Sequence, residues 1–505
     1  MEKVIRRALV SVYHKEGLAE ILKLLHEQGV EFVSTGGTST FIEGLGYPCV
    51  AVEDLTKYPS MLGGRVKTLH PAIQGGILAR RGHETDQKEV LEYGLSLIDL
   101  VIVDLYPFEA TVASGASEED IIEKIDIGGI SLIRGAAKNF EDVVIIPSQA
   151  DYATLLEILR ERGARTTLEE RRHFARRAFA VSSHYDSAIF RYFDAEDHSA
   201  LRLTADEAKP LRYGENPHQK GVFYGDLDRY FEQLHGKELS YNNLQDVEAA
   251  VSLIQDFSEP TFAILKHNNA CGCASRPTLL EAWTDALAGD PVSAFGGVLV
   301  ANRPIDVATA REIDKLFLEV LIAPDFDAEA LTILEGKKNR ILLRQKEAID
   351  ARWSYRSMLG GVLAQETDRA VETTAEMKPV TKVAPTAEEL TDLVFATKLV
   401  KHSKSNAIVL GKGGQLIASG VGQTSRVDAL KQAIEKARHF GFDLKGAVLA
   451  SDAFFPFDDC VTLAAEAGIT AIAQPGGSVR DADSIAAADR LGVAMVMTGV
   501  RHFKH

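Results

Sequence analysis

Lys266 and His267 are adjacent in a stretch whose residue types could carry out acid–base chemistry. They follow the apolar run of residues 261–265 and precede Asn268 and Asn269, so a predicted strand ends in an ammonium, an imidazole and two amides. Open α/β sheets bind small molecules at the edge where their strands end. A neutral imidazole can accept a proton near pH 7, and a neighbouring cation can stabilise the charge that develops. For the pair taken alone, the alternative is a solvated basic pair at a strand end.

Two glycine-flanked turns in the first 150 residues are suited to a phosphate group. One lies between a predicted strand and a predicted helix and reads Thr35-Gly36-Gly37-Thr38. Its glycines allow close approach of the backbone, and Thr38 or Ser39 can cap the helix, whose free N–H groups and dipole attract anions. The other turn groups two cations with a hydroxyl in Arg65-Val66-Lys67-Thr68, which suits a phosphomonoester. The alternatives are an ordinary strand–turn–helix connection and a solvated turn.

Further polar groups follow in the same region. Asp104 and Tyr106 come after a predicted central strand, Asp126 comes just before two glycines at a predicted helix start, and Lys138 comes later. Together these residues would place a carboxylate, an ammonium and a phenol near the phosphate turns, which is enough for proton transfer on a nucleotide. The alternatives are a helix N-cap for Asp126 and a surface position for Lys138.

The composition is that of an ordinary globular protein with more than one domain. The 505 residues exceed the length at which single cores stop growing, and 46% of them are hydrophobic. A formal net charge of −16 argues against nucleic acid as a partner. Four cysteines without disulfide or zinc-site spacing favour a reducing cytoplasm. No apolar run approaches the ~18 residues that span a bilayer, and the start of the chain lacks a signal-peptide core, so no membrane is expected.

Apolar runs in the first 150 residues alternate with helical patterns. Residues 8–13, 30–34, 98–103 and 143–146 read as buried strands, and apolar residues recur at helical spacing between residues 18 and 25. This alternation predicts a parallel sheet covered by helices on both faces. Residues 151–193 are expected to be mainly helical, and the polar passage 195–209 is the best candidate for a linker.

The second half of the chain contains new α/β material. Its predicted strands are residues 261–265, 297–301, 407–410, 446–451 and 494–497. Residues 261–300 and 446–475 share a layout in which a strand is followed by a polar turn. We therefore expect a duplicated α/β subdomain.

Three stretches resemble a known family over essentially the full length of the chain. These are residues 61–71, the run Asp126-Ile127-Gly128-Gly129, and residues 211–219. They resemble the bifunctional purine-synthesis enzymes that join an IMP cyclohydrolase to an AICAR transformylase. The first domain is also similar to the methylglyoxal synthase fold, which the regulatory domain of carbamoyl phosphate synthetase shares.

The resemblance implies an α/β fold with two domains. Residues 1–199 would form the cyclohydrolase domain, whose methylglyoxal-synthase-like core (residues 1–148) would be a doubly wound parallel sheet. Residues 200–505 would form the transformylase domain, built from two cytidine-deaminase-like α/β subdomains. It also implies a homodimer with transformylase sites built across the subunit interface.

For the first domain, the resemblance implies two overlapping groups of site residues. The catalytic group would be Lys67, Tyr106, Asp126 and Lys138. The group that binds IMP or formyl-AICAR would be Tyr13, His14, Lys15, Thr35, Gly36, Gly37, Thr38, Arg65, Val66, Lys67, Thr68, Asp104, Leu105, Asp126 and Ile127.

For the second domain, the resemblance implies that Lys266 and His267 are the catalytic pair. Relatives commonly show a proline two residues further along the turn, where this chain reads Asn268-Asn269-Ala270. The AICAR ligands would be Arg212, Tyr213, His267, Gly296, Glu319, Asn406, Arg426 and Arg501. The folate ligands would be Val427, Phe454, Asp459, Ser478 and Val479.

The implied reactions need a cosubstrate but neither a metal nor a tightly bound cofactor. AICAR would take a formyl group from 10-formyltetrahydrofolate, and formyl-AICAR would then close to IMP with loss of water. His267 would remove the proton of the attacking amine, and Lys266 would stabilise the oxyanion or protonate the departing folate nitrogen.

Two alternatives belong to other functional classes. A non-catalytic nucleotide-binding regulatory module would account for the phosphate turns of the first domain, but not for Lys266 and His267. A zinc deaminase-like enzyme would suit a duplicated α/β unit, but it needs a His-x-Glu and a Pro-Cys-x-x-Cys ligand set, which this sequence lacks.

Overall fold

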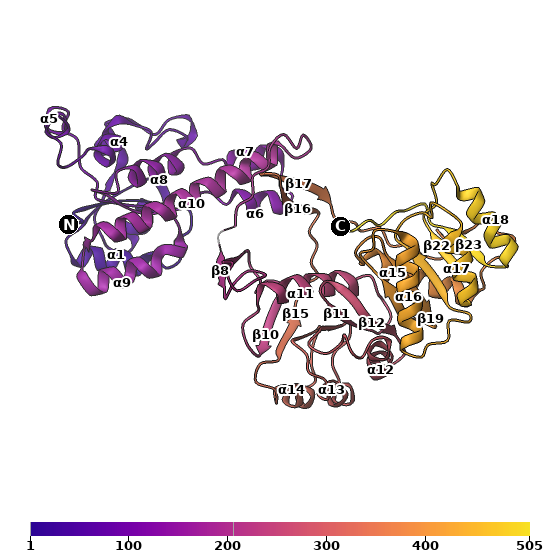
Figure 1. Cartoon of the computed structure of the whole chain (residues 1–505). Helices are drawn as coiled ribbons and strands as arrows, with labels where there is room; N and C mark the ends of the chain where they lie inside the picture. The colour runs from indigo at the N-terminus through magenta and orange to yellow at the C-terminus, as the bar shows by residue number, and fades with distance from the viewer. Residues whose placement is uncertain (1, 206) are drawn as a thin grey trace. The chain divides into compact units, whose positions relative to one another are not determined.

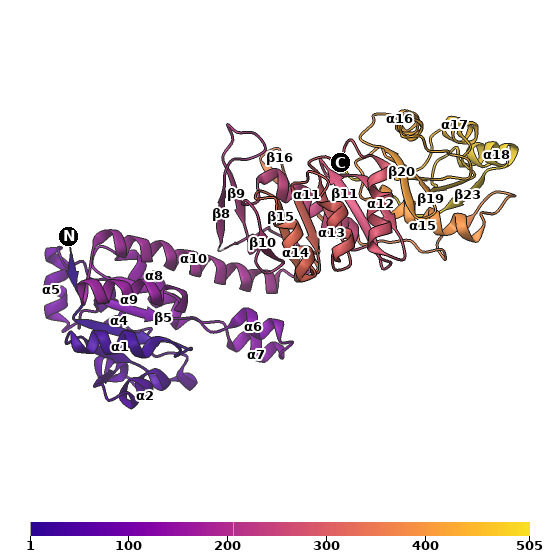
Figure 2. The same ribbon diagram turned by 90° about the horizontal axis from the view of Figure 1, so that it is seen from below.

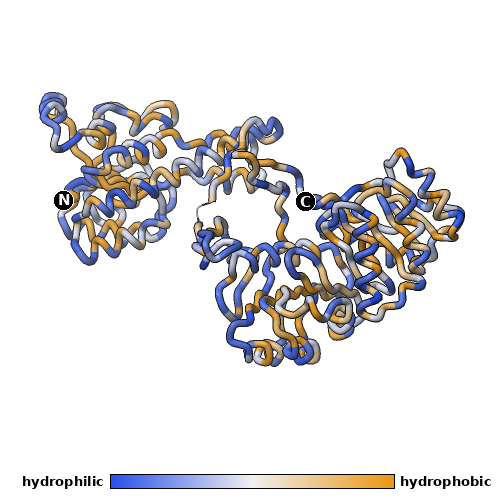
Figure 3. Tube along the Cα trace, in the orientation of Figure 1, coloured by the Kyte–Doolittle hydropathy of each residue, from blue (hydrophilic) through white to orange (hydrophobic). Residues whose placement is uncertain are grey.

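The computed structural model of the protein describes residues 2–205 and 207–505. The chain forms two compact units, Met1–Asp206 and Glu207–His505 (Figure 1). In both units, apolar residues concentrate along the inner strands and polar residues on the outer turns (Figure 3). None of the helices within the described ranges combines the length and the apolar character needed to cross a membrane.

Unit 1 is built on a parallel sheet with strand order β4-β3-β2-β5-β6. Its strands are β2 (Arg7–Ser11), β3 (Glu31–Ser34), β4 (Cys49–Ala51), β5 (Leu100–Val103) and β6 (Val144–Ile146). All residues of the inner strand β5 are buried, as expected for a strand covered on both faces. The predicted parallel sheet is therefore confirmed.

Helices cover both faces of this sheet (Figure 1). On one face α1 (Leu18–Glu27) packs beside α9 (Tyr152–Arg162); on the other, α8 (Gly128–Lys138) lies against β5 and β6 and contacts α4 (Pro71–Leu78) and α10 (Leu168–Phe193). The smaller elements of unit 1 are β1 (Lys3–Val4), α2 (Gly36–Gly44), α3 (Val52–Thr56), η1 (Leu62–Gly64), α5 (Glu84–Glu92), α6 (Phe108–Ala113), α7 (Glu118–Glu123), η2 (Gln149–Asp151) and β7 (Arg165–Thr166).

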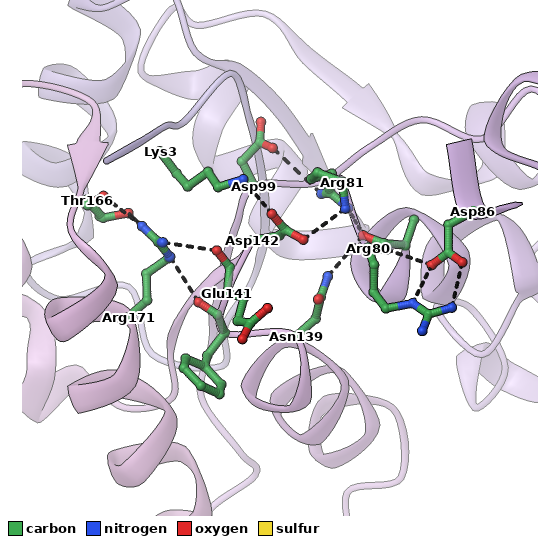
Figure 4. Close-up of polar contacts among 12 residues, drawn as sticks. Lys3, Arg80, Arg81, Asp86, Asp99, Asn139, Glu141, Asp142, Thr166 and Arg171 are labelled. Carbon is green, nitrogen blue, oxygen red and sulfur yellow. Dashed lines mark hydrogen bonds and ion pairs between the residues drawn. The ribbon is translucent and has the colours of Figure 1, made fainter. Parts of the chain in front are cut away.

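The edge of the sheet where β5 and β6 begin is closed by paired charges (Figure 4). Lys3 Nζ lies 2.6 Å from Asp142 Oδ1, and the Arg81 backbone N–H donates to the other oxygen of Asp142. The buried Arg171 guanidinium donates to the carbonyl of Glu141, and Asn139 Nδ2 donates to the carbonyl of Ile77. Because these groups are satisfied by one another, this edge has a structural role.

Unit 2 contains one large sheet, in which twelve strands of the described residues follow the order β10-β15-β14-β13-β11-β12-β20-β19-β21-β22-β23-β18. The first six in sequence are β10 (Phe231–His235), β11 (Thr261–Lys266), β12 (Asn269–Ser275), β13 (Val298–Ala301), β14 (Val320–Ala323) and β15 (Ile341–Gln345). The others are β18 (Lys378–Pro379), β19 (Ile408–Lys412), β20 (Gln415–Gly420), β21 (Val448–Ser451), β22 (Ala471–Gln474) and β23 (Ala494–Met497).

The pairing of these strands shows an internal duplication. In the first half β11 pairs antiparallel with both β12 and β13, and β13, β14 and β15 run parallel. In the second half β19, β20, β21, β22 and β23 repeat this pattern, and the halves join where β12 meets β20 antiparallel. The duplication was predicted, but with the wrong correspondence: residues 261–300 match a segment that starts at β19, not at residue 446. Apolar runs reveal strands without revealing their partners.

Helices sandwich the large sheet (Figure 2). One face is covered by α11 (Tyr241–Ile254) and α15 (Ala387–Lys401), which share one continuous core. The other face has a separate core in each half. Its helices are α12 (Leu279–Gly289), α13 (Val307–Ile313), α14 (Ala328–Leu334), α16 (Arg426–His439), α17 (Asp459–Ala467) and α18 (Asp481–Leu491).

Two hairpins of unit 2 stand apart from the large sheet. One pairs β8 (Ala208–Leu211) with β9 (Gly221–Tyr224), and the other pairs β16 (Trp353–Met358) with β17 (Gly361–Glu366). Every residue of β17 is exposed, and so is every residue of β16 except the half-buried Trp353.

Candidate active sites

Unit 1 has a cavity of about 710 Å³ at the edge where its parallel strands end. It lies at the end of the sheet opposite to the paired charges of Figure 4, because Asp99 precedes β5 whereas Asp104 follows it. The cavity is lined by many of the predicted residues, namely Tyr13, Lys15, Thr35, Gly36, Gly37, Thr38, Arg65, Lys67, Thr68, Asp104, Tyr106, Asp126 and Ile127. The sheet thus gathers motifs that are more than 100 residues apart in sequence.

Asp104 fixes the backbone of residues 13 and 14 beside the cavity. Its carboxylate accepts hydrogen bonds from the backbone N–H groups of Tyr13 and His14, and its Oδ2 lies 2.8 Å from His14 Nδ1. These bonds draw residues 12–14 out of the strand, so β2 ends at Ser11 and not at the predicted Tyr13. The His14 imidazole is occupied by Asp104 and is not among the lining groups.

Thr38 joins the glycine turn to the backbone of Val12. Its hydroxyl donates to the Val12 carbonyl (3.0 Å) and accepts from the Val12 N–H (3.2 Å). The prediction that Thr38 or Ser39 caps the helix is wrong, because α2 already begins at Gly36 and its N-cap, Thr35, makes no side-chain cap bond. The first N–H groups of α2 lack side-chain caps and border the cavity, as an anion site requires.

Lys67 lies where two glycines leave space for it. A Cβ added to Gly64 would lie 2.7 Å from Lys67 Cε, and one added to Gly36 would lie 3.5 Å from Lys67 Nζ. Both glycines have positive φ angles, 93° and 47°, which other residues adopt at a cost. The two motifs found in the sequence therefore converge on one ammonium group at the glycine turn.

Asp126 is held at the start of α8. Its Oδ1 accepts from the Gly129 N–H in the first turn of α8 (2.6 Å), although the N-cap residue is Ile127 and not Asp126, and its own N–H donates to the Tyr185 hydroxyl (2.9 Å). Burial raises the pKa of Asp126, a backbone hydrogen bond from Gly129 opposes the shift, and the nearby Asp104 adds to it. A carboxyl group with a raised pKa can exchange protons closer to neutral pH.

Tyr106 is the phenol of the cavity. Burial raises the pKa of Tyr106, and the negative charge of Asp126 adds to the shift. The phenol therefore stays protonated around neutral pH and can donate a hydrogen bond to a developing anion.

Two charged lining residues, Glu123 and Lys124, were missed in the sequence. Lys124 Nζ lies 5.6 Å from the Tyr13 ring centroid and 5.7 Å from that of Tyr106. Glu123 pairs with Arg65. Both lie at the end of α7 in a charged, helical stretch that reads as an ordinary solvated helix, and only the packing of that helix brings them to the cavity.

Lys138 is not brought to this cavity. It is exposed at the last turn of α8, whereas the cavity is bordered by Gly128 and Gly129 at the first turn. Ten residues of helix separate the two ends by about 15 Å, and the next residue, Asn139, belongs to the opposite edge of the sheet (Figure 4). Val66 and Leu105 are also absent from the lining.

In unit 2, Lys266 and His267 occupy a tight hairpin between β11 and β12. Lys266 pairs with Asn269, and both turn residues have positive φ angles, 53° for His267 and 64° for Asn268. These values are typical of a type I′ turn, which favours asparagine. The predicted strand does end at Lys266, but it runs antiparallel to β13 and so does not end where the parallel strands end. The hairpin lies beside the starts of the parallel strands in its half, since Leu265 pairs with Val298.

Neighbouring groups hold this hairpin in place. Lys266 Nζ donates to the Phe295 carbonyl (2.8 Å), the Asn268 N–H donates to Asp246 (2.7 Å), and the Lys404 N–H donates to Asn269 Oδ1 (3.1 Å). The last bond joins the hairpin of the first half to the loop before β19 in the second.

The strand register brings most of the predicted second-unit residues to one edge of the sheet. Gly296 and Glu319 precede β13 and β14 beside the hairpin, while Asn406 precedes β19, which runs antiparallel to β21. The ends of β21, β22 and β23 therefore lie at this edge, and they are followed in turn by Phe454 and Asp459, by Ser478 and Val479, and by Arg501. Arg212 and Tyr213 follow β8, outside the large sheet, with the Arg212 guanidinium 5.6 Å from the Tyr213 ring.

Arg426 is buried and paired, which its assignment as a substrate ligand did not foresee. Its guanidinium forms an ion pair with the fully buried Asp452 and donates to Ser451 Oγ (3.0 Å) and to Asn406 Oδ1 (2.7 Å). Arg426 thus orients the Asn406 amide. Glu319 is likewise engaged by Lys237 Nζ, 2.5 Å away.

The exposed predicted ligands at this edge include charged and apolar residues. The charged ones are Arg501, whose guanidinium lies 4.4 Å from the Phe503 ring, and Asp459, which begins α17. The apolar ones are Phe454, which is 36% exposed, and Val479, which is fully exposed. Val427 is half-buried against the core on the outer face of the second half.

A second cavity, about 1180 Å³, opens at the opposite edge of the large sheet, beside the start of β11 and the end of β12. No predicted ligand lines it. Across the described parts of the chain, no group of three or more His, Cys, Asp or Glu side chains is arranged to hold a metal ion.

Comparison with known families gives two matches in this chain. The family described as "AICARFT/IMPCHase bienzyme" matches residues 136–436, and the family described as "MGS-like domain" matches residues 17–131.

Individual relatives match over the whole chain. A "Bifunctional purine biosynthesis protein PurH" from Bacteroides thetaiotaomicron is 68% identical and covers 100% of this chain and 99% of the relative. Proteins of the same name from Chloroflexus aurantiacus and Acetivibrio thermocellus are 48% and 47% identical, with 99–100% of each chain covered.

Proposed function

Because this chain belongs to the AICARFT/IMPCHase bienzyme family, we propose that unit 1 carries the IMP cyclohydrolase site and unit 2 the AICAR transformylase site. The chain as a whole is a bifunctional enzyme of purine biosynthesis. It transfers a formyl group from 10-formyltetrahydrofolate to AICAR and cyclises formyl-AICAR to IMP with loss of water.

The observation that carries the first assignment is the cavity of unit 1. It combines an uncapped helix start at Gly36 with the cations Lys67 and Arg65, a set suited to the phosphate of the nucleotide. Asp126 and Tyr106 border the same space as proton carriers.

Cyclisation needs little covalent chemistry from the protein. The carboxamide nitrogen of formyl-AICAR attacks the formyl carbon, and the formyl oxygen leaves as water, so nucleophile and electrophile belong to one molecule. Asp126 accepts the proton of the attacking nitrogen, and Tyr106 and Lys67 donate hydrogen bonds to the oxyanion. The oxygen then takes up this proton and the proton of the formamide nitrogen and departs as water, while that nitrogen forms the C=N bond of the new ring. For Lys138, which lies at the far end of α8, a catalytic role would require a different position of that residue.

The first assignment is tested with a fragment. We place the domain boundary between residues 199 and 200, so residues 1–199 expressed alone are expected to cyclise formyl-AICAR without folate. A folded, soluble fragment without this activity would contradict the assignment or the boundary.

In unit 2, formyl transfer begins when the amino group of AICAR attacks the formyl carbon. This amine is a weak nucleophile because its lone pair delocalises into the ring and the carboxamide. His267 takes its proton, the bond from the formyl carbon to the folate nitrogen breaks, and Lys266 supplies a proton to that nitrogen. The hairpin holds the imidazole and the ammonium on adjacent residues.

His267→Ala tests this assignment. Formyl transfer should be abolished in the full chain, while cyclisation of added formyl-AICAR continues at the wild-type rate. Tetrahydrofolate and IMP are measured separately. Loss of cyclisation in a folded variant would refute the separation of the two sites.

We assign the remaining predicted ligands to the same edge of unit 2. AICAR would be bound by Arg212, Tyr213, Gly296, Glu319 and Arg501, with Asn406 oriented by Arg426. The folate would contact Val427, Phe454, Asp459, Ser478 and Val479, with the Phe454 ring stacking on the pterin. No tightly bound cofactor is assigned, and the compartment would be the cytoplasm.

A homodimer is supported by the β16–β17 hairpin. An isolated two-stranded hairpin is only marginally stable in water, yet this one exposes Tyr355, Val362, Leu363 and the fully exposed Leu359. Burial against a second copy of the chain would stabilise it. Sedimentation of a Leu359→Ser/Leu363→Ser variant should show a shift toward monomer. Monomeric wild-type protein at micromolar concentration would refute the dimer.

A further inference from the structure

His502 in the C-terminal tail is a buried charged group that neither reaction uses. Its Nδ1 lies 2.6 Å from Asp368 Oδ2, and its Nε2 lies 2.8 Å from Glu372 Oε1. The His502 side chain is 2% exposed and that of Glu372 is 4% exposed. Both ring nitrogens face carboxylates, so only the imidazolium form can donate to both. Burial disfavours this charge, but the two carboxylates outweigh it and raise the pKa of His502 to about 9.

The tail that contains His502 is bonded to the loops at the catalytic edge of the sheet. The His502 N–H donates to the Asp452 carbonyl (2.9 Å), the Ser405 N–H donates to the Lys504 carbonyl (2.9 Å), and the Lys504 N–H donates to Ser405 Oγ (3.1 Å). The Ser405 hydroxyl in turn donates to the Asp452 carboxylate that pairs with Arg426. A shift of the tail would therefore disturb the loop that contains Ser405, before β19, and the loop that contains Asp452, after β21.

We propose that His502 is a positioning residue for formyl transfer: clamped between Asp368 and Glu372, it holds the C-terminal tail so that Arg501 meets AICAR. This inference rests on the proposed assignment of formyl transfer to unit 2 and of Arg501 to AICAR. The clamp joins two segments far apart in sequence, since Asp368 and Glu372 follow β17 whereas His502 follows β23.

The clamp is expected to open at alkaline pH. The charged groups that act on the clamp are Asp368 and Glu372 on His502 and Lys401 on Asp368; Arg501 and Lys504 are the neighbouring charged residues of the tail. The pKa of His502 in the folded chain lies above its ordinary value of about 6.5. The protonated imidazole therefore contributes its full stabilisation of the folded chain below pH ~6.5, and this contribution is lost as the pH rises through about 9.

The test uses the full chain and measures KM and kcat for AICAR between pH 6 and 10 at saturating 10-formyltetrahydrofolate. His502→Gln should raise the KM for AICAR about tenfold at pH 7 and change kcat much less. Glu372→Gln should move the alkaline rise in KM to lower pH by half a unit or more, because His502 loses one of its carboxylates. Glu376→Gln, an exposed residue of the same segment, is the matched control and should behave as wild type. Cyclisation should be unchanged in all three.

Specific results would overturn the proposal. A KM–pH profile of Glu372→Gln that superimposes on wild type would do so, as would less than twofold change in KM for a folded His502→Gln. If His502→Gln does not fold, the profile of Glu372→Gln decides alone, because a merely structural role would not move a pH profile. Wild-type protein that cyclises but transfers no formyl group would overturn the proposed function together with this inference. Normal wild-type transfer with unaltered variants would overturn the role of His502 alone.

Discussion

The Asp452→Asn variant tests how the catalytic edge of unit 2 is held together. Arg426 and Asp452 are 6% and 0% exposed, and their ion pair is surrounded by the bonds of Asn406 and Ser405. Removing one charge of a buried pair leaves the other uncompensated and costs about 3–5 kcal/mol. The new amide oxygen can still accept from the Ala407 N–H, which favours the lower end of that range.

In a unit that spans residues 207–505 each kcal/mol lowers the Tm by roughly 1.6 °C, so the melting of unit 2 should shift by roughly 5–8 °C. Calorimetry on the full chain measures this, with cyclisation as the check that unit 1 is intact. Asp428→Asn is the control, because Asp428 is exposed in the first turn of α16, the helix that begins with Arg426; it should leave the melting of unit 2 nearly unchanged.

A double variant completes the test. Replacing both partners by apolar residues, Arg426→Met with Asp452→Leu, should recover much of the lost stability, because no buried charge then remains unpaired. Formyl transfer should stay low, since Asn406 has lost the group that orients it. An Asp452→Asn variant no less stable than the Asp428→Asn control would refute the reasoning.

Three further predictions concern unit 1. Asp126→Asn should lower the rate of cyclisation about 10²–10⁴-fold and leave formyl transfer unchanged; equal loss of both activities would contradict a local role. Tyr106→Phe should lower the rate of cyclisation and remove the alkaline limb of its pH–rate profile. In wild type this limb should lie above the pH at which an ordinary tyrosine titrates, because burial raises the pKa of Tyr106. An unchanged alkaline limb would exclude a role for the Tyr106 phenol. Gly64→Ala should raise the KM for formyl-AICAR, because its Cβ would displace Lys67; an unchanged KM would show that this ammonium does not bind the substrate.

Several strands of each unit could be predicted because their apolar runs have a direct physical cause, although β4, β12, β14, β15, β20 and β22 were not among the predicted strands. A strand covered on both faces, such as β5, must be apolar throughout, and its position in the chain follows from composition alone. Pairing is different. The match of β11 with β19 rests on how each strand pairs with its own neighbours, β12 and β13 in the first half and β20 and β21 in the second, and the residue types of the strands do not show these pairings.

The two sites differ in how far local patterns were sufficient. In unit 1, the glycine turn and the run containing Lys67 were found because tight turns and clustered cations are visible locally, and they do converge. Lys124 reached the same cavity from an ordinary-looking helix, while Lys138 was carried to the far end of α8. Lys138 and Asp126 are close in sequence but not in space, because α8 lies between them.

The amino-acid sequence by itself determined the α/β class, the parallel sheet of unit 1, the existence of a duplication in unit 2, and the family to which the chain belongs. These properties follow from short-range patterns and from motifs read letter by letter. Only the tertiary structure decided that Lys266 and His267 occupy a tight hairpin, that Arg426 is buried against Asp452, and that His502 is clamped between two carboxylates. The physical reason is that burial and charge pairing depend on which distant segments meet.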